Sequence, residues 1–134
     1  MEIFFSIFVR SGGMLENDYR GVIEKIALRQ QGAHTILEVT WKLLDEDLQQ
    51  RVQMAKITAR QSVSLDLEDG VLAFGKNKNV LLTQLRDALG QNIDGQPWSF
   101  SHLEGAGPAL IHVKERIADD GHKFNEVARV SSLV

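Results

Sequence analysis

The chain has 134 residues, the length of one domain, and its 43% hydrophobic and 25% charged residues are ordinary for a globular protein. Cysteine is absent, so disulfide bonds, zinc–thiolate sites and cysteine nucleophiles are excluded, and we expect the chain in a reducing cytoplasm. The formal net charge of −3 excludes a strongly basic nucleic-acid-binding protein but leaves room for a local basic face.

The chain begins with an apolar run, Ile3–Val9, which is much shorter than the roughly 20 residues needed to cross a membrane. A signal peptide would carry positive charge before such a run, whereas Glu2 precedes it and Arg10 follows it. We therefore expect no membrane association. Two interpretations stay open for residues 1–13: an additional β-strand, favoured by its Phe, Ile and Val content, or an extension upstream of a start at Met14.

From Met14 onward the hydropathy pattern predicts three strands, one helix and two further strands. The second strand alternates clearly, because Leu37, Val39 and Trp41 fall on one face and Lys42 on the other. Less regular apolar residues in the first strand favour a strand that is buried on both faces or bent by a bulge. The predicted strands cover residues 19–29, 35–44, 51–64, 109–117 and 124–130.

The predicted helix covers residues 80–89 and has apolar residues at helical spacing. Asn79 is expected to cap its first turn, and Gly90 to adopt the left-handed conformation that ends a helix. This order of elements is that of the OB-fold, a five-stranded Greek-key barrel. We therefore predict a mainly β, OB-fold-like domain over residues 14–134, with its helix between the third and fourth strands. Another small β-barrel or an open α+β sheet is the alternative.

Motifs for catalysis or metal binding are weak. The four histidines lack a metal-binding spacing, and Ser99 lies near His102 without the glycines of a nucleophile elbow. A P-loop-like spacing runs from Gly70 to Lys76, but Asn77 stands where Ser or Thr is required. We therefore expect a protein that is not an enzyme and that needs no metal and no cofactor.

The remaining pattern favours single-stranded nucleic acid, which proteins bind with a basic groove and aromatic platforms. Cations on the outer face of the second and third strands, extended by neighbouring segments, would form the basic part; their alternative role is to keep that face soluble. Trp98 and Phe100 are expected to pack under the helix. The candidate nucleic-acid-binding residues are Arg29, Lys42, Arg51, Lys56, Thr58 and Arg60, with Tyr19 and Phe124 for base stacking.

The segments Gly75–Val80, Leu85–Asn92 and Gly95–Phe100, followed by Leu103–Gly105, resemble a family of small phage and prophage proteins. Some members have unknown function, and others are described as single-stranded DNA-binding proteins of recombination modules. The resemblance, which extends from about Tyr19 onward, implies an OB-like fold and DNA binding in phage replication or recombination, in the cytoplasm of a bacterial host. It carries over no catalytic or base-contacting residue.

Two classes of function stay open on this fold. The first is a non-catalytic single-stranded DNA-binding protein, with a recombination or host protein as a further partner and with homo-oligomerisation undecided. The second is a protein–protein interaction module of phage origin, such as an inhibitor of a host system or a partner of a recombinase. The negative net charge favours the second class, and the family resemblance favours the first.

Overall fold

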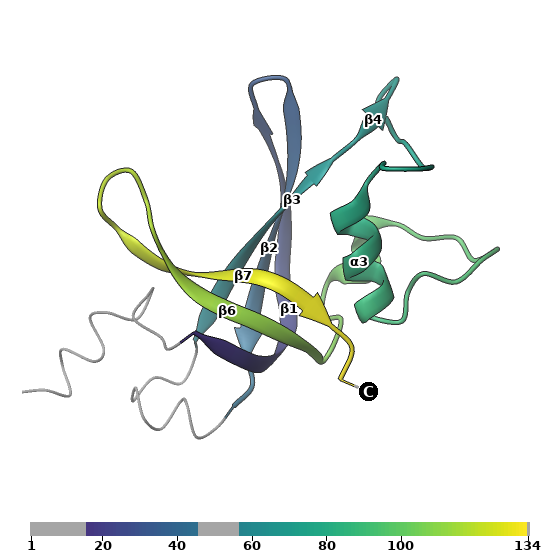
Figure 1. Cartoon of the computed structure of the whole chain (residues 1–134). Helices are drawn as coiled ribbons and strands as arrows, with labels where there is room; N and C mark the ends of the chain where they lie inside the picture. Colours follow the sequence, from purple (N-terminus) through teal and green to yellow (C-terminus); the bar gives the residue numbers. More distant parts are fainter. Residues whose placement is uncertain (1–15, 46–56, 134) are drawn as a thin grey trace, which may run out of the picture.

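Five long strands close into a barrel in the order β1, β2, β3, β7 and β6, as Figure 1 shows. The computed structural model describes residues 16–45 and 57–133, so the predictions for residues 1–13, Arg51 and Lys56 lie outside the described residues. A mainly β protein with a five-stranded barrel is confirmed. The barrel strands are β1 Asn17–Gln31, β2 His34–Leu43, β3 Thr58–Leu65, β6 Ala109–Ile117 and β7 Lys123–Ser131.

Neighbouring strands of the barrel pair antiparallel, except between β3 and β7. The start of β1 pairs with β6, and the rest of β1 pairs with β2, so one long strand contributes to two seams of the barrel. Strands β3 and β7 run parallel and meet at Arg60 and Glu126. This closure places residues side by side that are far apart in the sequence, and the candidate site depends on it.

The barrel interior is filled by alternate residues of the strands. In β2, Leu37, Val39, Trp41 and Leu43 are all fully buried, as their alternation predicts. The indole Nε1 of Trp41 donates a hydrogen bond of 2.9 Å to Oε1 of Gln61, so these two polar atoms are paired inside the core. The strand residues that lie between these buried positions point outward and form the outer face of the barrel.

Strand β1 bends where its register with β2 shifts between Ile23 and Lys25. Such a bulge turns the strand, which lets β1 leave β6 and continue along β2. Gly21 lies just before the bend, where the strands are crowded. A Cβ at this position would lie 3.0 Å from Cδ1 of Ile111 and 3.3 Å from Cε3 of Trp41, so a larger residue would fit only if these side chains shifted.

Helix α3, Val80–Ala88, follows β3 and precedes β6 in the chain. Its end is as predicted, because Gly90 has a φ of 71°. The N–H groups of Gly90 and Gln91 donate to the carbonyl oxygens of Asp87 and Arg86 over 3.1 and 2.8 Å, which is the pattern of a Schellman motif. The buried side chains of the helix are Leu82, Leu85 and Arg86.

The prediction that the side chain of Asn79 caps α3 is wrong. This residue is left-handed, with a φ of 48°, and its side chain is turned into the protein, where it is 1% exposed. Its Oδ1 accepts from the N–H of Asp66 at 2.7 Å, and its Nδ2 donates to the carbonyl oxygens of Asp66 and Ala73 at 2.9 and 2.6 Å. These bonds fasten the hairpin of β4 (Leu67–Glu68) and β5 (Val71–Leu72) to the start of the helix.

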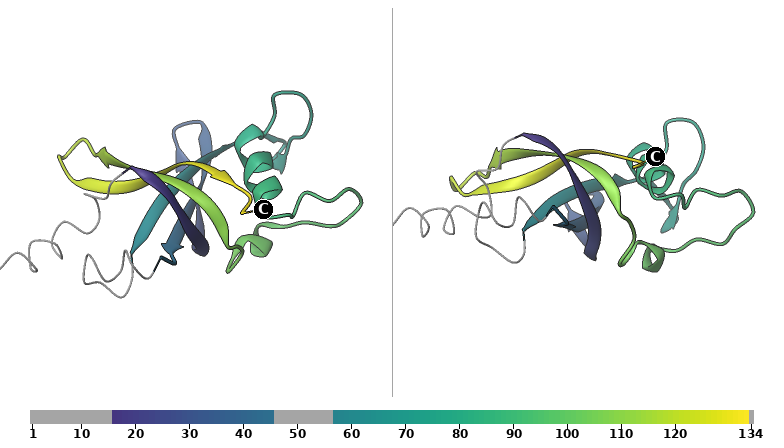
Figure 2. Two further views of the ribbon diagram at one scale, coloured as in Figure 1. Left: turned by 60° about the horizontal axis from the view of Figure 1, so that its bottom comes forward. Right: turned by 90° about the horizontal axis from the view of Figure 1, so that it is seen from below.

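The β4–β5 hairpin, α3 and the segment 91–100 lie together on one side of the barrel, and Figure 2 shows the tip of the β6–β7 hairpin on the opposite side. A short 3-10 helix, Phe100–Leu103, leads from this segment toward β6. No helix in the described ranges is long and apolar enough to cross a membrane.

Candidate functional site

The outer face of β2, β3 and β7 gathers four of the residues that the sequence singles out. Lys42 and Thr58 are opposite each other in the register of β2 and β3. Arg60 lies further along β3 on the same side, because side chains alternate along a strand. The parallel pairing of β3 with β7 then brings Phe124 next to Arg60. Residues separated widely in the sequence thus share one surface.

Arg60 and Phe124 form a stacked pair, which we call the Arg60–Phe124 platform. The guanidinium carbon of Arg60 lies 4.2 Å from the centroid of the Phe124 ring, within the range of a cation–π contact. Arg60 is exposed and Phe124 is half-buried. Within residues 16–45 and 57–133, no carboxylate forms an ion pair with Arg60. The platform therefore offers a flat surface and a positive charge that is not held in an ion pair.

Three shallow hollows surround Arg60, with volumes of about 260, 190 and 180 Å³. Each is smaller than the roughly 300–1,000 Å³ of an enclosing ligand pocket, so this face suits an extended ligand that lies along it. Besides Arg60, the largest of the three is lined by Lys25, Ile26, Ala27, Glu38 and Thr40. The second is lined by Thr58, His122, Phe124 and Asn125, and the third by Arg29, Glu38, Ser62, Phe124 and Glu126.

Acidic residues neutralise part of the predicted basic face. The guanidinium of Arg29 donates to Oε1 of Glu38 through Nη2 at 2.6 Å and through Nε at 2.9 Å. On the other side of the platform, Arg116 pairs with Glu126 at 3.0 Å. Arg29 therefore contributes little net charge, and Arg60 provides the charge at the centre of the face.

Asn125 lies beneath the platform and joins β7 to β3. Its side chain is 1% exposed, and its Nδ2 donates to the carbonyl oxygen of Thr58 at 3.1 Å. Its Oδ1 has no hydrogen-bond partner among the described residues. Sequence reasoning missed this residue, although a polar side chain at an inward position of a strand is a signal that was available.

Tyr19 was expected to stack on a base, and this is wrong. Its side chain is 6% exposed and belongs to the core, opposite Ile111 of β6. The bulge between Ile23 and Lys25 comes after this part of β1, so the alternation from Tyr19 to Ile23 is regular. Counted back from the buried Ile23, Tyr19 falls on the inward face. Phe124 is left as the aromatic candidate from the sequence.

Trp98 packs beside α3, as expected. The Cζ of Arg86 lies 4.5 Å from the centroid of its ring, and the ring of Phe100 meets it edge-on at 5.6 Å. Its indole N–H donates to Oε1 of Gln91 at 2.9 Å. Both Trp98 and Phe100 are partly buried against the core. Arg86 lies buried beneath this loop, and no motif or spacing in the sequence singles it out.

His112 forms a separate cluster with two acidic residues at the start of β1. Its Nδ1 lies 2.7 Å from Oδ1 of Asp18, and its Nε2 lies 3.0 Å from Oε2 of Glu16. Hydrogen bonding to Asp18, and then to Glu16, raises the pKa of His112 above its usual value near 6.5. Two carboxylates thus hold the imidazole of His112 in place.

The pair Ser99 and His102 has a structural role at the start of the 3-10 helix. The N–H of Ser99 donates to Nδ1 of His102 at 3.0 Å, and the Ser99 hydroxyl lies 3.2 Å from the same nitrogen. These contacts form a capping box. In the ranges that the structure describes, no group of three His, Asp or Glu side chains is arranged to hold a metal ion.

The platform can contact a planar, negatively charged ligand, because an aromatic ring stacks on bases and a guanidinium binds phosphate. Hydroxyl groups of Thr58 and Ser62 and the ammonium group of Lys42 lie on the same strands. Comparisons with protein-family models, with curated proteins and with solved structures found no match to this chain.

Proposed function

We propose that this protein is an OB-fold protein that binds single-stranded DNA without catalysis, in phage replication or recombination within a bacterial cytoplasm. The observation that carries the proposal is the Arg60–Phe124 platform on the outer face of a closed barrel. The phage setting is supported only by the family resemblance, which extends from about Tyr19 onward.

The OB-fold assignment is supported by the order of elements and by their pairing. The helix comes between the third and fourth barrel strands, the first strand pairs with the fourth, and the third strand meets the fifth in parallel. OB-folds bind oligonucleotides on the face of their second and third strands and on the loops beside it. Lys42, Thr58 and Arg60 belong to those two strands.

A single strand fits this face better than a duplex. Stacking on Phe124 requires an unpaired base, because bases in a duplex are stacked on each other. The supply of cations is small, since Glu38 compensates Arg29 and Glu126 compensates Arg116. Two phosphate contacts, by Arg60 and Lys42, would give a log–log slope of affinity against salt of about −1.4. Binding is therefore expected to depend on stacking as much as on charge.

Fluorescence anisotropy with a labelled oligothymidine and a matched duplex, each at low and moderate salt, tests the proposal. We expect the single strand to bind more tightly than the duplex. Phe124→Ala should weaken binding of the single strand by about 1–3 kcal/mol, the usual contribution of one stacked base. Arg60→Gln should weaken it and make the salt slope shallower by about 0.7.

Arg129→Gln is the matched control, because Arg129 is an exposed arginine of β7 that lies away from the platform. It should leave the affinity near that of the wild type. An absence of single-strand binding at low salt would contradict the proposal and favour the protein–protein interaction module instead. Equal loss in Arg60→Gln and Arg129→Gln, with no loss in Phe124→Ala, would show a non-specific charge effect rather than a site.

A further inference from the structure

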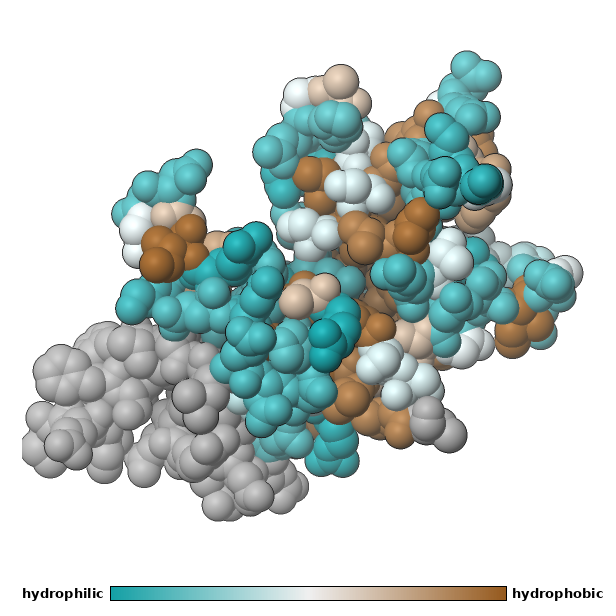
Figure 3. Space-filling model, in the orientation of Figure 1, coloured by the Kyte–Doolittle hydropathy of each residue, from teal (hydrophilic) through white to brown (hydrophobic). Residues whose placement is uncertain are grey.

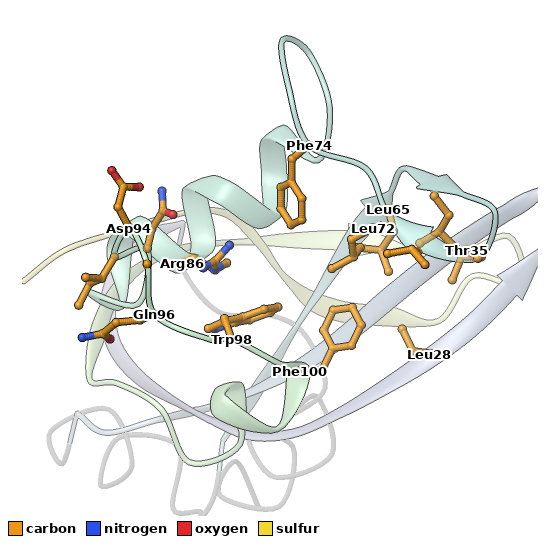
Figure 4. Close-up of a pocket in the computed structure, with 16 residues that line it drawn as sticks. Leu28, Thr35, Leu65, Leu72, Phe74, Arg86, Asp94, Gln96, Trp98 and Phe100 are labelled. Atoms are coloured by element: carbon orange, nitrogen blue, oxygen red, sulfur yellow. The ribbon is translucent and has the colours of Figure 1, made fainter.

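A second surface, separate from the platform, is an apolar groove with a volume of about 700 Å³. Its walls come from the β1–β2 hairpin, the β4–β5 hairpin, α3 and the segment 91–100, and it shares no lining residue with the hollows around Arg60. Figure 4 shows its side chains, among them Leu28, Phe74, Arg86, Trp98 and Phe100. The volume is within the range of about 300–1,000 Å³ that is typical of binding sites.

The walls of the groove expose large apolar side chains to solvent. Val71 is 67% exposed, Phe74 is 64% exposed and Leu28 is 58% exposed. In Figure 3, apolar side chains gather between the β1–β2 hairpin and α3. Contiguous apolar surface of this kind is typical of an interaction site, because exposing it to water is unfavourable.

The groove also contains a buried cation. Arg86 is 9% exposed, and its guanidinium lies over the ring of Trp98 (Figure 4). Its Nη2 donates to the carbonyl oxygen of Gln91 at 3.3 Å, whereas its Nε has no hydrogen-bond partner among the described residues. None of the carboxylates described in the structure forms an ion pair with Arg86. Burying a cation without a counter-charge is costly, so a carboxylate bound in the groove would supply the counter-charge that Arg86 lacks.

We propose that this groove binds a short peptide of a partner protein, one in which a single carboxylate is flanked by large apolar side chains. The carboxylate would accept hydrogen bonds from the guanidinium of Arg86. The apolar side chains would cover Phe74, Leu28 and the other exposed residues of the walls.

The charge of the groove favours a peptide over nucleic acid. Arg86 is the only cation among its lining residues, and Asp94 lies on the same lining, so a backbone of several phosphates would meet as much repulsion as attraction. The rim favours a peptide over a fatty acid. Gln96 and Thr35 present amide and hydroxyl groups that can form hydrogen bonds with peptide groups, whereas an alkyl chain has no hydrogen-bond donor or acceptor.

The test uses short, capped, fluorescently labelled peptides in which one aspartate is flanked by leucine and phenylalanine, each matched with a peptide in which asparagine replaces the aspartate. Anisotropy is measured with the full chain. We expect the aspartate peptides to bind at least about tenfold more tightly than the asparagine peptides, because a bond to a charged group is stronger than a neutral one. Arg86→Met should remove that difference.

Arg86→Met keeps most of the side-chain volume, and thermal unfolding of the variant verifies that it folds. Phe74→Ala changes an exposed wall residue and should weaken both kinds of peptide without unfolding the protein. Arg129→Met is the matched control and should leave peptide binding unchanged. Absence of saturable binding by every peptide, an unchanged preference for aspartate in Arg86→Met, or competition by oligothymidine for the groove would each overturn the proposal. Oligothymidine binding to Arg86→Met at wild-type affinity would support two independent sites.

Discussion

Replacing Asn79 with alanine should separate the β4–β5 hairpin from the start of α3. The amide makes three hydrogen bonds, at 2.6, 2.7 and 2.9 Å, with backbone groups of Asp66 and Ala73, and its side chain is 1% exposed. A hydrogen bond contributes about 0.5–1.5 kcal/mol net, so the loss of three should lower the free energy of unfolding by about 1.5–4.5 kcal/mol. The loss is expected to approach the upper end of this range, because the backbone N–H of Asp66 and the carbonyl oxygens of Asp66 and Ala73 would be left without hydrogen-bond partners.

Urea denaturation, followed by circular dichroism, measures this change. The slope of the unfolding free energy against urea concentration is taken as equal for both proteins only if their transitions are equally cooperative. Asn79→Asp is the matched variant. It keeps an acceptor for the N–H of Asp66, but it lacks the two N–H donors and adds a buried charge beside two carbonyl oxygens. A loss at least as large as that of Asn79→Ala is therefore expected. A change below about 0.5 kcal/mol in Asn79→Ala would refute the reasoning, because that is the typical effect of a neutral surface substitution.

Further predictions concern packing and pH. Trp98→Ala should lower the free energy of unfolding by about 3 kcal/mol, the low end for a buried aromatic, because the ring is partly exposed. Trp98→Phe should lower it by about 1 kcal/mol, because the hydrogen bond to Gln91 is lost; urea denaturation measures both changes. Gly21→Ala should cost about 1–3 kcal/mol, since its Cβ would lie 3.0 Å from Ile111; no loss would show that β6 can move away. The raised pKa of His112 stabilises the fold below pH about 6.5, and this stability is lost as pH rises through the folded pKa. The advantage of wild type over His112→Gln in melting temperature should therefore shrink between pH 5.5 and pH 8, as thermal melts over about that range will test.

The alternation of apolar residues was enough to predict the strands that have a regular register. In β2, Leu37, Val39 and Trp41 are buried as their spacing requires, and the predicted ends of β6 agree with the structure. Gly90 ends α3 as predicted, because a left-handed position depends only on local backbone geometry. The alternation of apolar residues and the local conformational preferences of single residues are thus enough to predict most strands of the barrel.

Features that depend on distant parts of the chain were not predictable in this way. Asn79 was expected to cap the helix that follows it, but its side chain forms hydrogen bonds with Asp66 and Ala73, which only the tertiary fold brings near. Tyr19 was chosen as an aromatic residue at the start of a strand, but the pairing of β1 with β6 puts it in the core, opposite Ile111. The burial of Arg86 also depends on the tertiary fold, because the distant segment that carries Trp98 folds over it.

The candidate site shows the same division. Lys42, Thr58 and Arg60 were placed on one face from the alternation of two neighbouring strands. Their closeness to Phe124 required the parallel contact between β3 and β7, which a hydropathy pattern does not specify. The compensation of Arg29 by Glu38 follows from strand pairing as well, and it reduces the charge available to a ligand.

A nuclear magnetic resonance titration tests the central claim most directly. Amide shifts of the isotope-labelled protein are followed while unlabelled oligothymidine is added at low salt. Binding at the platform predicts dose-dependent shifts that cluster at Thr58, Arg60 and Phe124, with little change at Phe74 and Trp98. Shifts centred on the apolar groove, or none at saturating oligonucleotide, would contradict the assignment of DNA binding to the Arg60–Phe124 platform.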